Sequence, residues 1–242
     1  MTEDPYRWLE AIANRREYIQ TQLKGGSAVL AASVPQGILV LAVGAGQSKV
    51  FEIFDRQALG GVGHPADVEK IRQSLIDAAH LEAFTRAPED VTLRRLVAQG
   101  LSQQLKGAFE QIFAPPMLAR LLLAEVGPTP DEDVLIKLGF DGSFSFPVGV
   151  AVVAPDIEQE NPAEARLKAR LGNGAASLND LVATAKVLAQ EWTVLLDEAN
   201  LPDAATPVPG RTFEVALLRR QTSPQARYQA LNPEDLGLIR NP

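Results

Sequence analysis

The sequence predicts an α+β fold of four layers (αββα), in which two stacked antiparallel β-sheets are covered by helices on both outer faces. Strand-like segments come in blocks, and helix-like segments follow each block in pairs. The strand–helix–strand alternation that would indicate a parallel sheet does not occur in the pattern. The chain has 242 residues, 46% of them hydrophobic and 22% charged, which is enough for a sizeable core. We therefore predict a single domain over residues 1–242.

A helix is predicted ahead of the first strand, over residues 8–24. Thr2 and Asp4 are residue types that cap helices, and Pro5 suits a first helical turn. Gly25-Gly26 would end this helix. Its apolar residues recur at helical spacing, at Trp8, Ile12, Ile19 and Leu23. Because this apolar stripe is narrow, we expect the helix to lie on a neighbouring surface rather than in a deep core.

Four short strands and two helices are predicted next. The strands are the apolar runs Ala28–Ser33, Ile38–Val43, Lys49–Asp55 and Gln57–Val62. Pro35-Gln36-Gly37 is a turn signal between the first two. His64-Pro65 opens the first helix, and Pro88 separates it from a second helix over Leu93–Ile112, which Pro115-Pro116 ends.

The second half of the chain repeats this order. Its predicted strands are Met117–Val126, Val134–Phe140, Ser143–Phe146, Val148–Ala154 and, as the last one, Phe213–Arg220. Met117–Val126 is nearly continuous in apolar residues, as in a strand buried on both faces, and Asp141-Gly142 indicates a hairpin. Two helices are predicted over 156–172 and 177–199, followed by a Pro-rich loop at 202–210. We place the αββα core at 27–220 and a tail at 221–242, in which Asn232-Pro233 opens a short helix.

Composition excludes several classes of function. The net charge of −7 is unsuited to a nucleic-acid backbone, and the sequence contains no cysteine for disulfides or thiol chemistry. No apolar run reaches the roughly 18 residues of a membrane span, and the N-terminal residues lack the layout of a signal peptide. We expect a cytoplasmic protein that contacts neither nucleic acid nor membrane.

None of the motifs typical of a small-ligand or metal site is complete in this sequence. The loop Gly44–Lys49 resembles a phosphate loop, but it lacks the Gly before Lys and is followed by a predicted strand. His64 and His80 are too far apart for a helical metal-binding pair and are expected at the surface or in a cap. No Gly-x-Ser-x-Gly motif marks a serine hydrolase. The acidic run Asp131–Asp133 is expected to be a solvated turn. We expect no cofactor and no metal.

Seven segments, in their order and spacing, carry a family resemblance over nearly the whole chain. They are Gly26–Leu30, Ile38–Ala42, Ser48–Ile53, Leu121–Gly127, Phe213–Arg220, Tyr228–Leu231 and Glu234–Leu236. With these segments the chain resembles the proteasome α subunits, especially those of actinobacteria. The resemblance implies the N-terminal nucleophile hydrolase fold, with an extra helix before the first strand.

The same resemblance implies that the chain has no catalytic residue of its own. In the family's β subunits an N-terminal threonine attacks the peptide bond, supported by an aspartate and a lysine. Here Gly26 or Ser27 falls at the threonine position, Gly44 replaces the aspartate, and only the lysine is retained, as Lys49. The alternative is a self-processing peptidase with Ser27 as nucleophile beside Lys49, which requires cleavage after Gly26.

The resemblance also implies partners and residue roles. The chain would form a homo-oligomeric, heptameric α ring on a ring of β subunits, through its first helix and the helix after His64. It would admit unfolded protein substrates through a gate made of Met1, Thr2, Glu3, Asp4, Pro5, Tyr6 and Arg7. Lys49 would receive the C-terminal carboxylate of a ring-shaped AAA+ ATPase activator, a role that suits a compact cation.

Overall fold

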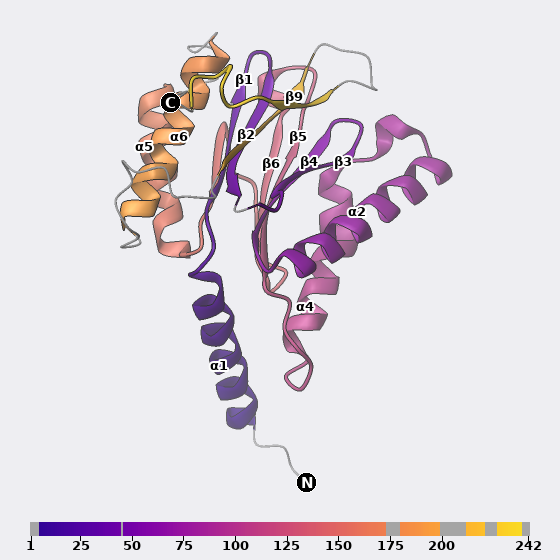
Figure 1. Ribbon diagram of the computed structural model, residues 1–242. Helices are drawn as coiled ribbons and strands as arrows, with labels where there is room; N and C mark the ends of the chain where they lie inside the picture. The colour runs from indigo at the N-terminus through magenta and orange to yellow at the C-terminus, as the bar shows by residue number, and fades with distance from the viewer. Residues whose placement is uncertain (1–4, 45, 173–179, 199–211, 221–226, 239–242) are drawn as a thin grey trace.

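The fold is a stack of two five-stranded sheets between two layers of helices (Figure 1). It is seen in a computed structural model, which describes residues 5–44, 46–172, 180–198, 212–220 and 227–238. Within these residues, sheet A has the strand order β10-β9-β2-β1-β8 and sheet B the order β3-β4-β5-β6-β7. Every pairing between neighbouring strands of the two sheets is antiparallel. The predicted α+β, four-layer αββα class is confirmed.

The strands closely follow the predicted runs. In chain order they are β1 Val29–Val34, β2 Gly37–Gly44, β3 Val50–Phe54, β4 Gln57–Gly63, β5 Ala119–Glu125, β6 Val134–Leu138, β7 Phe144–Ser145, β8 Val150–Val153, β9 Thr212–Arg219 and β10 Tyr228–Leu231. Strands β1, β2 and β5 are buried along their whole length. Their largely apolar sequence arises because each has one face against the other sheet and one against helices.

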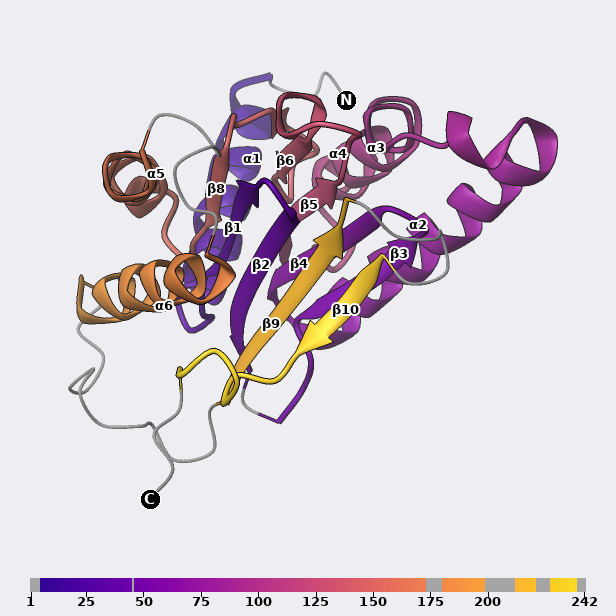
Figure 2. The ribbon, with the colours of Figure 1, turned by 90° about the horizontal axis from the view of Figure 1, so that it is seen from above.

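The helices cover the two outer faces in pairs. They are α1 Pro5–Leu23, α2 Pro65–Thr85, α3 Leu93–Arg95, α4 Ser102–Glu110, α5 Glu160–Leu171 and α6 Leu181–Glu198, and a π-helical turn, Leu96–Leu101, joins α3 to α4. Helices α5 and α6 pack on sheet A, and α2 to α4 pack on sheet B (Figures 1 and 2). A third apolar cluster fills the space between the sheets. Burial of these three layers is the main stabilising contribution to the fold.

Helix α1 extends from one end of the sandwich and is fastened there by its C-terminal half. Ile19 and Leu23 are buried against Phe109 and Phe140. The guanidinium of Arg15 donates hydrogen bonds to three main-chain carbonyls at the end of α4, those of Ala108, Ile112 and Ala114. These bonds satisfy acceptors that a helix C-terminus leaves open. The expected position of this helix on a neighbouring surface is therefore correct, although it begins at Pro5 rather than at residue 8.

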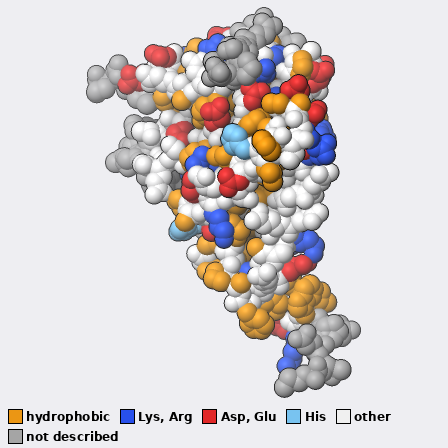
Figure 3. Space-filling model, turned by 90° about the vertical axis from the view of Figure 1, so that its right-hand side faces the viewer, with side chains coloured by type: hydrophobic (Ala, Val, Ile, Leu, Met, Phe, Trp, Pro, Cys, Tyr) orange, Lys and Arg blue, Asp and Glu red, His pale blue; other side chains and the backbone are white. Residues whose placement is uncertain are grey.

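Large apolar side chains remain exposed on α1 and α2. They are Trp8, Leu9 and Tyr18 on α1 and Leu81 and Phe84 on α2. Figure 3 views the α2 side of the molecule and shows hydrophobic surface towards the lower end of the view, with charges of both signs elsewhere. Exposed apolar groups of this size are typical of surfaces that contact another protein.

Two predictions about the end of the chain are wrong. Phe213–Arg220 is not the last strand, because β10 pairs with β9 at the edge of sheet A and so part of the predicted tail belongs to the sheet. The helix predicted at Asn232-Pro233 is a turn, closed by hydrogen bonds from Gly237 N to Glu234 O and from Leu238 N to Pro233 O. The Pro-rich loop at 202–210 lies outside the described residues.

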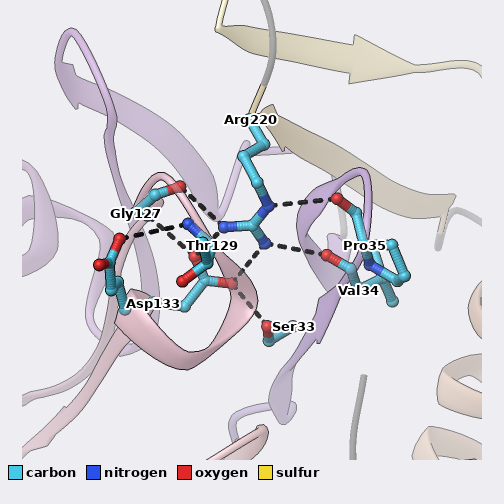
Figure 4. Close-up of polar contacts among 8 residues, drawn as sticks. Ser33, Val34, Pro35, Gly127, Thr129, Asp133 and Arg220 are labelled. Carbon is cyan, nitrogen blue, oxygen red and sulfur yellow. Dashed lines mark hydrogen bonds and ion pairs between the residues drawn. The ribbon is translucent and has the colours of Figure 1, made fainter. Parts of the chain in front are cut away.

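The acidic run Asp131–Asp133 also differs from its prediction as a solvated turn. Asp131 and Glu132 are exposed, but the Asp133 side chain is only 2% exposed and forms an ion pair with Arg220. Arg220 donates from all five of its N–H groups, to both Asp133 oxygens and to the carbonyls of Val34, Pro35 and Gly127 (Figure 4). A run of acids looks solvated in sequence because the arginine that pairs with it comes 87 residues later.

Candidate functional site: the Ser27–Lys49 end of the sandwich

The candidate site lies at the end of the sandwich where β1 begins and β2 ends. A cavity of about 210 Å³ opens there, lined by Ser27, Lys49 and four glycines, Gly25, Gly26, Gly61 and Gly63. Of these glycines, Gly25 faces open space, since a Cβ there would meet nothing within 4 Å. The chain reaches this cavity from α1, so the main-chain nitrogen of Ser27 is part of a peptide bond with Gly26.

Ser27 and Lys49, singled out from the sequence, lie in direct contact. Lys49 Nζ donates to Ser27 Oγ at 2.5 Å and to the Ser27 carbonyl at 3.2 Å. Ser27 Oγ in turn donates to the carbonyl of Val43 at 2.8 Å. Lys49 Nζ is thus placed against both oxygens of Ser27, within hydrogen-bond distance of each.

The main chain of Lys49 is held separately from its side chain. Its N–H donates to Glu214 Oε2 at 2.7 Å, and the N–H of Val50 donates to the same oxygen at 3.2 Å. The carbonyl oxygen of Lys49 accepts from Gly61 N at 3.0 Å. The sequence did not indicate Glu214, because a single acid within a strand is usually an outward-facing residue. Its position follows from the pairing register of β9 against β2.

Gly44, which replaces the expected aspartate, is in tight surroundings. A Cβ atom at this position would lie 2.3 Å from Glu214 Oε1 and 2.7 Å from the carbonyl oxygen of Gln47. A side chain cannot be accommodated there unless these groups move. The next described segment is strand β3, not a helix, so the phosphate-loop interpretation stays excluded.

The half-buried phenol of Tyr228 lies beside this loop. Tyr228 on β10 donates from its hydroxyl to the carbonyl of Val50 at 3.2 Å. Burial, together with the negative charges of Glu214 and Glu52, raises the pKa of Tyr228 to about 12. The hydroxyl is therefore neutral over the physiological range and serves as a fixed hydrogen-bond donor.

The remaining predicted residues lie elsewhere or outside the described part of the chain. His64 caps α2 by accepting from Ala66 N through Nδ1, and His80 packs edge-on against Phe54 with ring centroids 5.2 Å apart. Of the predicted gate, Met1 to Asp4 are outside the described residues, whereas Pro5 to Arg7 form the first turn of α1. In the described ranges no group of three acidic or imidazole side chains is placed to hold a metal ion, and no helix is long and apolar enough to cross a membrane.

The architecture defines the class of protein before any comparison of sequences. Two stacked antiparallel sheets between helix layers, with a Ser and a Lys meeting where the first strand begins, form the N-terminal nucleophile hydrolase fold. The helix before that strand distinguishes the chain from members of the class whose nucleophile is a free N-terminal residue.

Sequence comparison then points to the family. No family model matches the chain, but it is similar to several curated proteins named proteasome subunit alpha. The relative from Actinosynnema mirum is 34% identical over 138 residues, which are 56% of this chain and about half (51%) of the relative. The relatives from Pseudarthrobacter chlorophenolicus and Streptomyces scabiei are 27% and 28% identical, and their alignments cover 95% and 90% of this chain and 95% and 83% of those proteins. Over most of its length the chain is thus similar to actinobacterial proteins named proteasome subunit alpha.

Proposed function

We propose that the chain is a non-catalytic α subunit of a bacterial proteasome core particle, which forms outer rings, controls substrate entry and docks a ring ATPase. The observation that supports this most directly is the place of Ser27. Its nitrogen is bonded to Gly26 and follows an ordered helix, α1. An N-terminal nucleophile needs a free amine at this point, and Gly44 leaves no room for the supporting acid.

Assembly into a homo-oligomeric ring on proteasome β subunits is supported by exposed apolar side chains. Trp8 and Leu9 on α1 are 47% and 57% exposed, and Leu81 and Phe84 on α2 are 66% and 88% exposed. These are the two helices expected to make ring contacts, and obligate interfaces are enriched in such residues. Native mass spectrometry should give a sevenfold multiple of the 26.1-kDa chain; a monomer in the presence of β subunits would contradict the proposal.

Docking of the activator is assigned to Lys49. Its ammonium lies at a cavity whose lining includes four glycines, where the backbone of an incoming C-terminus can approach closely. A terminal carboxylate would accept from this cation and displace part of its contact with Ser27.

The variant Lys49→Ala tests this docking role. It should abolish ATPase-stimulated degradation and leave ring assembly intact. The matched control is Lys24→Ala, which removes the same charge from an exposed position just after α1. Retained stimulation in the Lys49 variant, or equal loss in both variants, would refute the role.

We assign the gate to residues 1–7. Their convergence at the axis of the ring would control substrate entry. Because α1 begins at Pro5, two deletions separate gate from helix. Removing residues 1–4 leaves the helix whole and should raise unactivated peptide hydrolysis in a reconstituted particle. If only removal of residues 1–7 has this effect, the gate depends on the first helical turn. Unchanged peptide hydrolysis with both deletions would contradict the gating role.

A second candidate function is a self-processing peptidase with Ser27 as nucleophile. The contact between Lys49 Nζ and Ser27 Oγ is the observation in its favour. Processing would remove the 26 residues before Ser27. The intact mass of the chain purified with its β partner therefore decides between the two functions, and we expect the full-length mass.

A further inference from the structure

The loop that carries Lys49 is fixed by a carboxylate that comes from the other end of the sequence. Glu214 lies on β9 of sheet A, while Lys49 directly precedes β3 of sheet B. One oxygen of Glu214 accepts from two successive main-chain amides, those of Lys49 at 2.7 Å and Val50 at 3.2 Å. Hydrogen bonds to an ionised acceptor are roughly twice as strong as those between neutral groups. The loop is thus attached to sheet A by charge-assisted bonds.

Lys49 is held from the opposite side as well. Its carbonyl accepts from Gly61 N, on β4 of sheet B, at 3.0 Å. Its main chain therefore bridges the two sheets at the mouth of the cavity, and its side chain has a fixed starting point from which to reach Ser27. Preorganisation of this kind favours binding because the ligand does not have to order the residue that receives it.

Glu214 can take this position only because residue 44 is glycine. Its second oxygen, Oε1, lies 2.3 Å from where a Cβ of residue 44 would stand. A side chain from β2 and the carboxylate from β9 compete for one space. The chain thus supplies an acid to this corner from strand β9 instead of from the end of β2, and directs it to main-chain amides rather than to a nucleophile.

We propose that Glu214 is the positioning residue of the Lys49 site, and that Gly44 and Glu214 act as a pair that sets Lys49 at the cavity. Glu214 does not need to touch a ligand; it acts through the main chain of Lys49 and Val50. This inference rests on the proposed docking role of Lys49, and its test separates the two.

Hydrogen exchange tests the anchor without any ligand. In the assembled protein, Glu214→Ala should accelerate exchange of the Lys49 and Val50 amides about tenfold or more, because these amides lose a charged acceptor. Glu214→Gln keeps the size of the side chain and one acceptor oxygen, so it should fold normally and give an intermediate rate. Unchanged exchange in Glu214→Ala overturns the inference.

The matched control is Glu52→Ala, on the exposed face of β3. Glu52 and Glu214 both raise the pKa of Tyr228, so both variants should lower that pKa, which can be followed by the ultraviolet absorption of the phenolate. Only the Glu214 variants should release the loop. Equal acceleration in Glu52→Ala would attribute the effect to local charge and overturn the specific role of Glu214.

Binding of a synthetic peptide tests the positioning role. The probe is the C-terminal octapeptide of the ring ATPase encoded by the same organism, with a free carboxylate, compared with the same peptide as a C-terminal amide. Glu214→Ala should weaken the free-acid peptide about tenfold and leave the weak binding of the amide unchanged. Full affinity despite faster exchange would overturn positioning. If Lys49→Ala binds normally, the docking role fails, while the exchange rates still decide whether Glu214 anchors the loop.

Discussion

At the end of the sandwich where β1 turns into β2, the Arg220 side chain is 4% exposed and uses every donor it has on Asp133 and three carbonyls. At the opposite end, Lys49 lies at a cavity lined in part by glycines and contacts Ser27. Both ends join sheet A to sheet B through a cation and an acid. At the Arg220 end the acid, Asp133, pairs with the guanidinium itself. At the Lys49 end the acid, Glu214, accepts a hydrogen bond from the main-chain N–H of the lysine. The first arrangement buries the cation within the fold, whereas the second places a half-buried lysine side chain at the cavity beside Ser27.

The largest effect is expected at the Arg220 end. Arg220→Met leaves the Asp133 carboxylate buried without its partner, and loss of one member of a buried pair costs about 3–5 kcal/mol. Urea unfolding at a fixed protein concentration measures it. The matched control is Arg72→Ala, which breaks a partly exposed pair with Glu69 within α2 and should cost about 0–1 kcal/mol. A cost for Arg220→Met no larger than that of the control would remove the proposed difference between the two ends.

A smaller effect is expected at the Lys49 end. Gly44→Ala places a Cβ within 2.3 Å of the Glu214 carboxylate, and overpacking of this kind costs about 1–3 kcal/mol. The control Gly25→Ala, at a glycine of the same cavity where an added Cβ would meet nothing within 4 Å, should be close to neutral. The double variant Gly44→Ala/Glu214→Ala should cost less than the sum of the two single variants, because the clash with Glu214 is gone and only the one with the Gln47 carbonyl oxygen remains. Strict additivity would mean that the two residues do not share one space.

The smallest effect is a change in pH dependence beside the Arg220 end. Glu125 lies two residues before Gly127, and burial raises its pKa, although bonds from Leu93 N and Gln57 and the charge of Arg56 oppose the shift. A raised pKa means that the folded chain holds this proton more tightly than the unfolded chain does. The stabilising contribution is therefore complete below the unfolded pKa, about 4.3, and is lost as the pH rises through the folded pKa. Glu125→Gln should flatten this part of the stability–pH curve, and an unchanged slope above the unfolded pKa would contradict it.

The sequence predicts the sandwich well because its strands are long apolar runs with clear turn signals. β10 escapes prediction because it is a four-residue edge strand with two of its residues exposed, so it lacks a pattern of its own. The site is predicted only in part. Ser27 and Lys49 are identified through the family resemblance, but the roles of Glu214 and Asp133 depend on partners that lie far away along the chain. Those pairings follow from strand register, which local periodicity does not contain.

The two sheets also differ in how their strands are drawn from the chain. Sheet B is made of five consecutive strands, β3 to β7, whereas sheet A joins β1 and β2 to β8, β9 and β10. Arg220 contacts Val34 across 186 residues of sequence. Because local contacts form faster than distant ones, sheet B and its helices should acquire structure while the chain is still being synthesised, and sheet A only afterwards. Pulse-labelled hydrogen exchange during refolding should therefore protect β4 and β5 before β2. Helix α1 reaches its buried neighbours Phe109 and Phe140 on the sheet B side, so it would be in place before the last strands arrive.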